Sequence, residues 1–349
     1  MSPIQVGLIG YGLAGRVFHA PTITAVPALQ LAQVVQRQGD EARQRYPWVE
    51  IVRESEALLN DPAIELVVIA TPNTSHFALA EAALQAGKHV VVDKPFTTTA
   101  AEAEQLIALA QAQQRVLSVY HNRRWDGDFL TVQKLLAGGH LGRLVEYESH
   151  FDRFRPGLKA NAWRETAVPG SGILYDLGSH LLDQAVVLFG LPRALTADIR
   201  IQRTGGVVDD SFALLLHYDE GLRVTLKAGM VVREPSPRFV LHGTAGSFIK
   251  YGLDPQEEAL KNGRTPLEPN WGSEPAAQWG TLNTSLDGLV VQGTVATLPG
   301  NYLAFYQDVA EAILKGREPA VTAVQAHQTM RLLELAQQSH EEGRRLEVC

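Results

Sequence analysis

The pattern of hydrophobic and polar residues changes near residue 121. In the first third of the chain, short and continuously apolar runs alternate with helix-like stretches. Continuous runs are typical of strands covered on both faces, and their alternation with helices predicts a doubly wound parallel sheet of the α/β class. The expected strands are residues 6–9, 31–35, 66–70, 89–92 and 116–119, and the expected helices between them include 77–86 and 100–113.

Beyond residue 121, apolar and polar residues alternate along residues 144–154. No helix-length segment separates the later runs, so we predict an open, mainly antiparallel sheet with one face free. These runs are residues 195–202, 211–218, 222–228, 238–242 and 247–251. Residues 252–301 are rich in Pro, Gly and Asn and predict long loops, and two helices are expected at 302–314 and 323–341.

The length of 349 residues predicts two domains. We expect an α/β domain over residues 1–121. Residues 122–349 would form an α+β domain whose C-terminal helices are candidates for packing back on the first domain. An uncovered apolar sheet face is costly, so a homodimer or homotetramer through the second sheet is expected.

Composition narrows the class of protein. Hydrophobic residues make up 45% and charged residues 20%, which is ordinary for a soluble globular protein, and the net charge of −7 disfavours nucleic acid and anionic membranes as partners. The single cysteine is Cys349, which excludes internal disulfides and thiolate metal sites. With no basic signal region and no apolar run long enough to span a bilayer, we expect a cytoplasmic protein.

A glycine-rich turn follows the first expected strand. Residues 10–15 read GYGLAG, a GxGxxG that opens a helix and is a good dinucleotide fingerprint in that setting. Gly10 would permit the tight turn, Gly12 the approach of the pyrophosphate, and Gly15 close helix–strand packing. The alternative is a plain strand–turn–helix. Pro21 lies within the helix, where we expect a break. The predicted cofactor contacts in the turn are Gly10, Tyr11, Gly12, Leu13, Ala14 and Gly15.

The end of the second expected strand bears on the cofactor. An NAD site places Asp or Glu there to bind the ribose 2′-hydroxyl, but this strand ends in Gln36 and Arg37, with no acid before Asp40. A guanidinium pairs with a 2′-phosphate, so NADP is favoured over NAD. The alternative is that Arg37 is a solvated loop residue.

Two further patterns could carry chemistry. Lys94 follows the strand at 89–92, where its ammonium could polarise a carbonyl or stabilise an alkoxide; the alternative is an ordinary surface lysine. Residues 172–183 predict a helix whose polar row borders its apolar stripe. The stripe consists of Ile173, Leu177, Leu181 and Leu188, and the polar row of Asp176, His180 and Asp183. A carboxylate beside an imidazole suits acid–base catalysis near neutral pH.

Two alternatives for the polar row stay open. The first is a His–Asp pair with a purely structural role. The second is a zinc or iron site, which the single imidazole and the lack of thiolates disfavour. We expect no metal.

Together, the GxGxxG at 10–15, the pair Lys94-Pro95 and the G-x-x-x-D-x-G-x-H at 172–180 resemble the Gfo/Idh/MocA oxidoreductases over essentially the whole chain. Residues 18–21, 121–126 and 151–156 resemble the branch that holds NADP-dependent scyllo-inositol dehydrogenases. Asp93 stands where the family usually has a glutamate. The resemblance implies that residues 1–121 form a Rossmann domain that binds NAD(P) and that residues 122–349 form the domain for substrate binding and oligomerisation.

The resemblance implies a catalytic triad of Lys94, Asp176 and His180, and a cofactor lined also by Lys94, the Thr71-Pro72-Asn73 turn and His76. The implied activity is NADP-dependent hydride transfer between the nicotinamide and a secondary hydroxyl of a cyclitol or sugar. The alternatives are another small carbonyl substrate, such as an aldose or a dihydrodiol, and a non-catalytic nucleotide sensor. The residues expected at the substrate are Asn122, Arg123, Asp152, Trp163, Arg164, Asp176 and His180.

Overall fold

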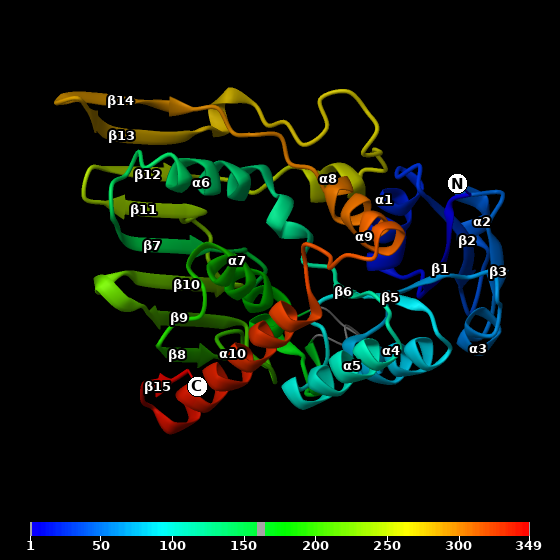
Figure 1. Cartoon of the computed structure of the whole chain (residues 1–349). Coiled ribbons are helices and arrows are strands. Elements are labelled where there is room, and N and C mark those ends of the chain that lie inside the picture. Colours follow the sequence, from blue (N-terminus) through cyan, green and yellow to red (C-terminus); the bar gives the residue numbers. More distant parts are fainter. Residues whose placement is uncertain (1, 159–164, 349) are drawn as a thin grey trace. The chain divides into compact units, whose positions relative to one another are not determined.

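The computed structural model describes residues 2–158 and 165–348, which form two compact units (Figure 1). The first unit comprises residues 1–125, 256–271 and 301–330, and the second 126–255, 272–300 and 331–349. The chain therefore first leaves the first unit after Trp125 and returns to it twice. None of the described helices is long and apolar enough to cross a membrane.

The first unit is built on a six-stranded sheet in which every neighbouring pair is parallel, in the order β3-β2-β1-β4-β5-β6. The strands are β1 Ile4–Ile9, β2 Leu29–Val35, β3 Glu50–Val52, β4 Leu66–Ile69, β5 His89–Val92 and β6 Leu117–Val119. This confirms the doubly wound parallel sheet and its five expected strands. The edge strand β3 was missed because its three residues are half-buried or exposed and form no apolar run.

Helices connect and cover these strands. They are α1 Ala20–Thr24, α2 Glu41–Arg45, α3 Ser55–Leu59, α4 His76–Gln85, α5 Ala100–Ala112, α8 Gln256–Lys261 and α9 Leu303–Lys315. Helices α1 and α9 share one buried core with β1, β2 and β4, through side chains such as Ile23 and Val309. Helix α5 begins at a capping box, in which Thr99 Oγ1 accepts from the Glu102 amide and the Glu102 carboxylate accepts from the Thr99 amide, both at 3.2 Å.

The expected break at Pro21 is wrong. After the glycine turn the helix continues through a π turn, η1 Gly15–His19, directly into α1. The Ala20 amide donates to the Gly15 carbonyl, one residue further back than in an α-helix. Proline lacks an N–H and clashes with the carbonyl four residues earlier, so a widened turn just before Pro21 lets the helix pass without breaking.

The second unit contains a nine-stranded sheet in the order β14-β13-β12-β11-β7-β10-β9-β8-β15. Only β7 and β10 pair in parallel, which confirms the mainly antiparallel sheet. The strands are β7 Leu144–His150, β8 Ala194–Arg200, β9 Ser211–His217, β10 Arg223–Gly229, β11 Phe239–Gly243, β12 Gly246–Lys250, β13 Gly280–Leu286, β14 Leu289–Val295 and β15 Leu346–Glu347.

The alternation read from the sequence matches the burial of this sheet. Along β9, for example, Phe212, Leu214 and Leu216 are buried, whereas the residues between them are half-buried. The helices of this unit are α6 Gly127–Ala137 and α7 Ser179–Phe189. Helix α7 packs on the sheet, as the ring contact of Phe189 with Tyr147 shows. The last helix, α10 Ala323–Glu342, is continuous and is shared by both units.

The expectation of long loops over residues 252–301 is wrong in part. This stretch contains α8 and the hairpin β13–β14 at one end of the nine-stranded sheet (Figure 1). The hairpin turns at Asp287-Gly288, both with positive φ, which is a standard two-residue hairpin signal. Strand β14 is almost wholly exposed, so burial imposes no apolar alternation that would reveal it.

Candidate functional site

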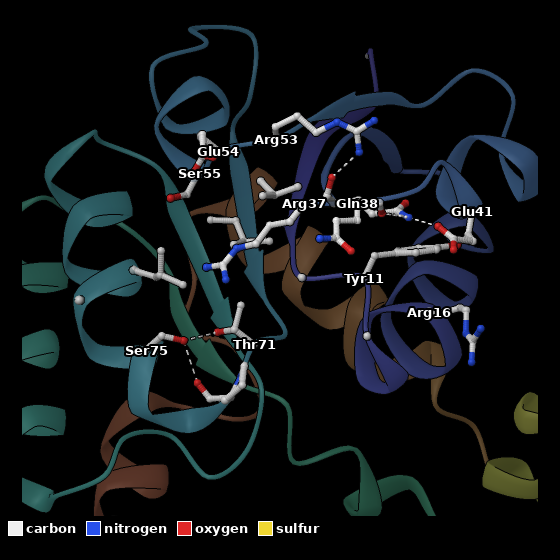
Figure 2. Close-up of a pocket in the computed structure, with 18 residues that line it drawn as sticks. Tyr11, Arg16, Arg37, Gln38, Glu41, Arg53, Glu54, Ser55, Thr71 and Ser75 are labelled. Atoms are coloured by element: carbon white, nitrogen blue, oxygen red, sulfur yellow. Dashed lines mark hydrogen bonds between the residues drawn. The ribbon is translucent and has the colours of Figure 1, made fainter. Parts of the chain in front are cut away.

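A cavity of about 600 Å³ lies in the first unit, where β1, β2, β3 and β4 end (Figure 2). Its walls are the residues that follow these strands, together with the exposed side of α4. In open α/β sheets, ligands bind at the carboxyl ends of the strands. The lining residues with polar side chains are Tyr11, Arg16, Gln36, Arg37, Gln38, Glu41, Arg53, Glu54, Ser55, Thr71 and Ser75.

The glycine turn forms one wall of the cavity. Gly10 has φ +101°, and a Cβ there would lie 2.7 Å from the Ala70 carbonyl oxygen. A Cβ on Gly15 would lie 2.0 Å from the Gly10 carbonyl oxygen. Gly12 is different, because a Cβ there would meet no heavy atom within 4 Å, and Gly12 is exposed and lines the cavity. The protein's own backbone therefore requires Gly10 and Gly15, whereas Gly12 leaves open space of the kind a pyrophosphate needs.

The other turn residues lie around this opening. Tyr11 lines the cavity, and burial chiefly raises the pKa of its phenol to about 12, so it stays neutral. Leu13 and Ala14 open the helix, whose first backbone bond runs from the Arg16 amide to the Gly12 carbonyl at 2.9 Å. Neither Leu13 nor Ala14 has a side chain among the cavity walls.

At the end of β2 the chain presents an amide and a guanidinium. The Gln36 side chain is buried, donates to the Gln38 carbonyl at 2.8 Å and to the Glu41 carboxylate, and accepts from the Ala42 amide at 3.1 Å. Arg37 is exposed, and Figure 2 shows its side chain extending into the cavity.

The turn after β4 forms the opposite wall. Thr71 and Pro72 line the cavity, and Ser75 Oγ ties the turn together by donating to Thr71 Oγ1 at 2.7 Å and to the Pro72 carbonyl at 2.8 Å. Asn73 is buried and begins the short 3₁₀ helix η2 Asn73–Ser75.

His76 lies beneath this turn and is not part of the cavity wall. Its imidazole is buried, with Nδ1 2.9 Å from the Pro95 carbonyl oxygen and Nε2 3.0 Å from the Thr71 carbonyl oxygen. His76 thus links the turn after β4 to the turn after β5. Burial lowers the pKa of His76.

In the turn after β5, the backbone of Lys94 is hydrogen-bonded to the buried carboxylate of Asp93. The Lys94 amide donates to Asp93 Oδ1 at 2.8 Å, and His19 Nε2 lies 3.8 Å from the same oxygen. His19 Nδ1 is 2.5 Å from the hydroxyl of Tyr306, whose pKa burial raises well above its ordinary value. Burial alone would raise the pKa of Asp93, but His19, Lys94 and His76 outweigh it and lower that pKa to about 2. Asp93 is therefore a charged group at neutral pH.

Sequence reasoning did not assign a role to His19. The only signal was its place in the Phe18-His19-Ala20-Pro21 motif. The contact with Asp93 joins residues far apart in the sequence and could not be inferred from spacing.

In the second unit, Asp176 and His180 lie on one helix that contains a π turn, η5 Leu174–Gly178. Asp176 is half-buried, with Oδ2 4.0 Å from Arg153 Nη1, and His180 is buried. The predicted border between an apolar stripe and a polar row does not hold, because His180 and Asp183 are both buried, while Leu188 of the stripe is only half-buried. The π turn does not account for this, because His180, Asp183 and Leu188 all lie on the regular helix α7 that follows it. The burial of a helix face depends on what packs against it, which the helical period alone does not give.

The predicted substrate residues divide between the units. Asp152 follows β7 in the second unit, with Oδ2 3.4 Å from His150 Nδ1. Asn122 and Arg123 are buried in η3 Asn122–Trp125 of the first unit, where Arg123 pairs with Glu257 of α8. Trp163 and Arg164 lie outside the described residues.

The predicted triad is likewise shared, since Lys94 belongs to the first unit and Asp176 and His180 to the second. Its assembly stays a prediction. Within residues 2–158 and 165–348, no group of three or more His, Cys, Asp or Glu side chains is arranged to hold a metal ion.

Two glycine substitutions separate folding from binding. Gly15→Ala should destabilise the protein by about 3 kcal/mol, because its methyl group meets a backbone oxygen that cannot move aside. Gly12→Ala should change stability by less than about 0.5 kcal/mol and weaken dinucleotide binding at least about tenfold, because its methyl group occupies only the opening. Urea unfolding and titration calorimetry with NAD and NADP measure the two effects. If Gly12→Ala binds both dinucleotides as tightly as the wild type, the assignment of the opening is contradicted.

The lowered pKa of Asp93 predicts that the free energy of unfolding decreases at acid pH. Because the folded-state pKa lies below the ordinary value of 3.8, the charged carboxylate stabilises the fold above about pH 4, and this contribution disappears as the pH falls towards 2. The stability difference between the wild type and Asp93→Asn should therefore shrink by about 2 kcal/mol over that range. Denaturant unfolding at several pH values tests this, with Asp287→Asn at the exposed hairpin turn as the control. If the stability difference between the wild type and Asp93→Asn does not change with pH, the pKa of Asp93 is not lowered in the folded protein.

Two models of the Gfo/Idh/MocA family match the chain. The model described as "Oxidoreductase family, NAD-binding Rossmann fold" matches residues 4–121. The model described as "Oxidoreductase family, C-terminal alpha/beta domain" matches residues 133–348.

Individual proteins match over nearly the whole chain. The chain is 49% identical to the uncharacterised oxidoreductase YdgJ of Escherichia coli, over 96% of each chain. It is 42% identical to IolW of Bacillus subtilis, named a scyllo-inositol 2-dehydrogenase (NADP(+)), over 98% of this chain and 95% of IolW. The solved structure of yvaA from Bacillus subtilis matches with a TM-score of 0.96 at 41% identity, covering 100% of this chain and 99% of that one. An oxidoreductase from Bacillus cereus matches with a TM-score of 0.90 at 34% identity, over 99% of each chain.

Proposed function

The chain belongs to the Gfo/Idh/MocA family of oxidoreductases, as its motifs predict, and we propose that it is an NADP-dependent enzyme that interconverts a secondary hydroxyl of a cyclitol or sugar and the corresponding ketone. The enzyme class follows from the family, which acts on CH–OH groups with NAD(P). The preference for NADP and the substrate are the proposal.

The observation that carries the cofactor preference is the end of β2. An Arg37 guanidinium extends into the cavity there, and the strand ends in the neutral, internally bonded Gln36 rather than in a carboxylate. A carboxylate would bind the 2′-hydroxyl of NAD and repel a 2′-phosphate, whereas a guanidinium attracts the phosphate. The NADP dependence in the name of IolW agrees with this preference.

The cavity fits such a cofactor at two points. The open space above Gly12 and the adjoining helix start suit the pyrophosphate, and Arg37 suits the 2′-phosphate. When bound, the nicotinamide supplies the two-electron redox chemistry, and the protein supplies binding, orientation and the proton.

The proposed proton chemistry uses three side chains. In the oxidising direction, an imidazole nitrogen of His180 takes the proton of the substrate hydroxyl. The Lys94 ammonium stabilises the negative charge that develops on the substrate oxygen. Asp176 orients His180 and favours its charged form. In ketone reduction His180 returns the proton.

The substrate class is supported by IolW alone among the relatives compared above, because its name specifies scyllo-inositol. More distant relatives, each 26% identical, are named levoglucosan dehydrogenase and D-apiose dehydrogenase, so the carbon skeleton is open to test. Purified enzyme should reduce NADP in the presence of an inositol, measured at the absorbance band of the reduced nicotinamide. Turnover of aldoses but not of inositols would replace the cyclitol assignment and leave the family unchanged.

The catalytic assignment predicts separate effects on turnover and binding. Lys94→Ala and His180→Ala should each lower kcat at least about a hundredfold, the usual contribution of a positioned acid–base or electrostatic group. The dissociation constant of NADP should change less than about threefold in the His180 variant. His140→Ala, at an exposed position outside the site, is the control. Wild-type turnover in either variant refutes the role of that residue.

The cofactor assignment predicts a specific loss in Arg37→Ala. Removing a charge-assisted phosphate contact should raise the dissociation constant of NADP by about 10- to 100-fold, and that of NAD by less than about threefold. Titration calorimetry with both cofactors measures this difference. Arg43→Ala, an exposed arginine on α2 that does not line the cavity, is the matched control. Equal losses for the two cofactors would overturn the assignment of Arg37.

A further inference from the structure

The loop that carries Arg37 is hydrogen-bonded by an arginine that follows the neighbouring strand β3. Arg53 directly follows β3, and its Nη1 donates to the Gln36 carbonyl at 2.7 Å and to the Gly39 carbonyl at 2.8 Å. These two carbonyls bracket Arg37 and Gln38. Figure 2 shows the Arg53 side chain reaching over to this loop.

The loop between the two carbonyls has little burial to hold it. Residues 37–40 are all exposed, and Gly39 has φ +74°, a conformation that glycine permits but does not enforce. The root of the loop is fixed, because the Gln36 amide donates to the Val52 carbonyl at 3.1 Å. Within the loop, the Gln36 side chain holds the Gln38 carbonyl, and at the far end the Gln44 amide donates to the Asp40 carbonyl at 3.0 Å. Arg53 bonds the carbonyls on both sides of Arg37 and Gln38, and so ties together the two ends of the segment that carries the guanidinium.

Charged groups of both signs surround the loop, so its position affects how strongly the cavity attracts an anion. The cavity wall carries Glu41 and Glu54 as well as arginines. Glu41 is bonded to the Gln36 amide, at the foot of the same loop. A loop that shifts by a few ångströms would change the balance between the Arg37 guanidinium and these carboxylates at the place where an anion is to be bound.

We propose that Arg53 is a positioning residue for cofactor selection: by bonding the carbonyls of Gln36 and Gly39, it holds Arg37 where the 2′-phosphate of NADP binds. This inference rests on the proposed preference for NADP. It adds a second determinant of cofactor choice, in the turn after β3, whereas Arg37 lies in the turn after β2.

The test is a double-mutant cycle in the full-length protein. The variants are Arg53→Met, which keeps the aliphatic stem, Arg37→Ala, and both together, each titrated with NADP and with NAD by calorimetry. Arg53→Met should raise the dissociation constant of NADP at least about tenfold and that of NAD by less than about threefold. In the Arg37→Ala background, the same change should raise the dissociation constant of NADP by less than about threefold, because there is no guanidinium left to position.

A second readout concerns the loop itself. Amide hydrogen exchange over residues 37–40 in the cofactor-free protein should be faster in Arg53→Met than in the wild type. The matched control is Arg43→Met, which removes an exposed arginine whose Nε bonds a backbone carbonyl, that of Val49 at 3.5 Å, outside the cavity wall. The control should leave both the exchange of the loop and the cofactor preference unchanged.

The other outcomes are distinguishable. An undiminished loss of NADP affinity in the Arg37→Ala background would mean that Arg53 acts on the phosphate directly, and equal losses for NADP and NAD would mean a merely structural role; either result overturns the inference. If Arg37→Ala itself affects both cofactors equally, the proposed NADP preference fails, whatever Arg53 does.

Discussion

The close approach of Gly15 to the carbonyl of Gly10 is the constraint on which the start of the first helix against β1 depends. A side chain at Gly15 would lie 2.0 Å from that oxygen, so the helix can start this near β1 only with glycine there. Gly15 is also the first residue of the π turn η1, whose last residue is His19. That turn directs the His19 imidazole toward Asp93, and Asp93 accepts the amide proton of Lys94. One backbone contact thus connects the wall of the cofactor cavity to the turn that carries the proposed catalytic lysine.

Much of this architecture is readable from the sequence because it depends on local pattern. Strands covered on both faces are continuously apolar, so β1, β2, β4, β5 and β6 are visible without any tertiary information. The GxGxxG turn is visible because its spacing reflects steric needs within six residues. The hairpin β13–β14 and the edge strand β3 are not visible by the same criterion. Neither buries a regular set of side chains, and only the Asp287-Gly288 turn gave a local hint.

What the sequence cannot supply is contact between distant segments. His19, Asp93 and Tyr306 come from three parts of the chain, and Arg53 reaches a loop that begins 17 residues earlier. Their residue types are ordinary in isolation: a histidine in a helix, an arginine after a short strand. Burial and neighbouring charges set the chemical state of such residues. The carboxylate of Asp93, for example, is held charged although burial alone would favour its neutral form.

Both motifs that carry candidate chemistry lie beside a π turn. Each motif of interest in the sequence, the glycine turn and the Asp176–His180 segment, leads into or contains a turn with one residue more than an α-helix allows. In η1 the extra residue accommodates Pro21 and places His19 beneath Asp93. In η5 the extra residue lies in the segment that carries Asp176, just ahead of the regular helix that carries His180 and Asp183. A π turn costs helical regularity and persists only where surrounding packing holds it, which is why such turns concentrate at functional sites.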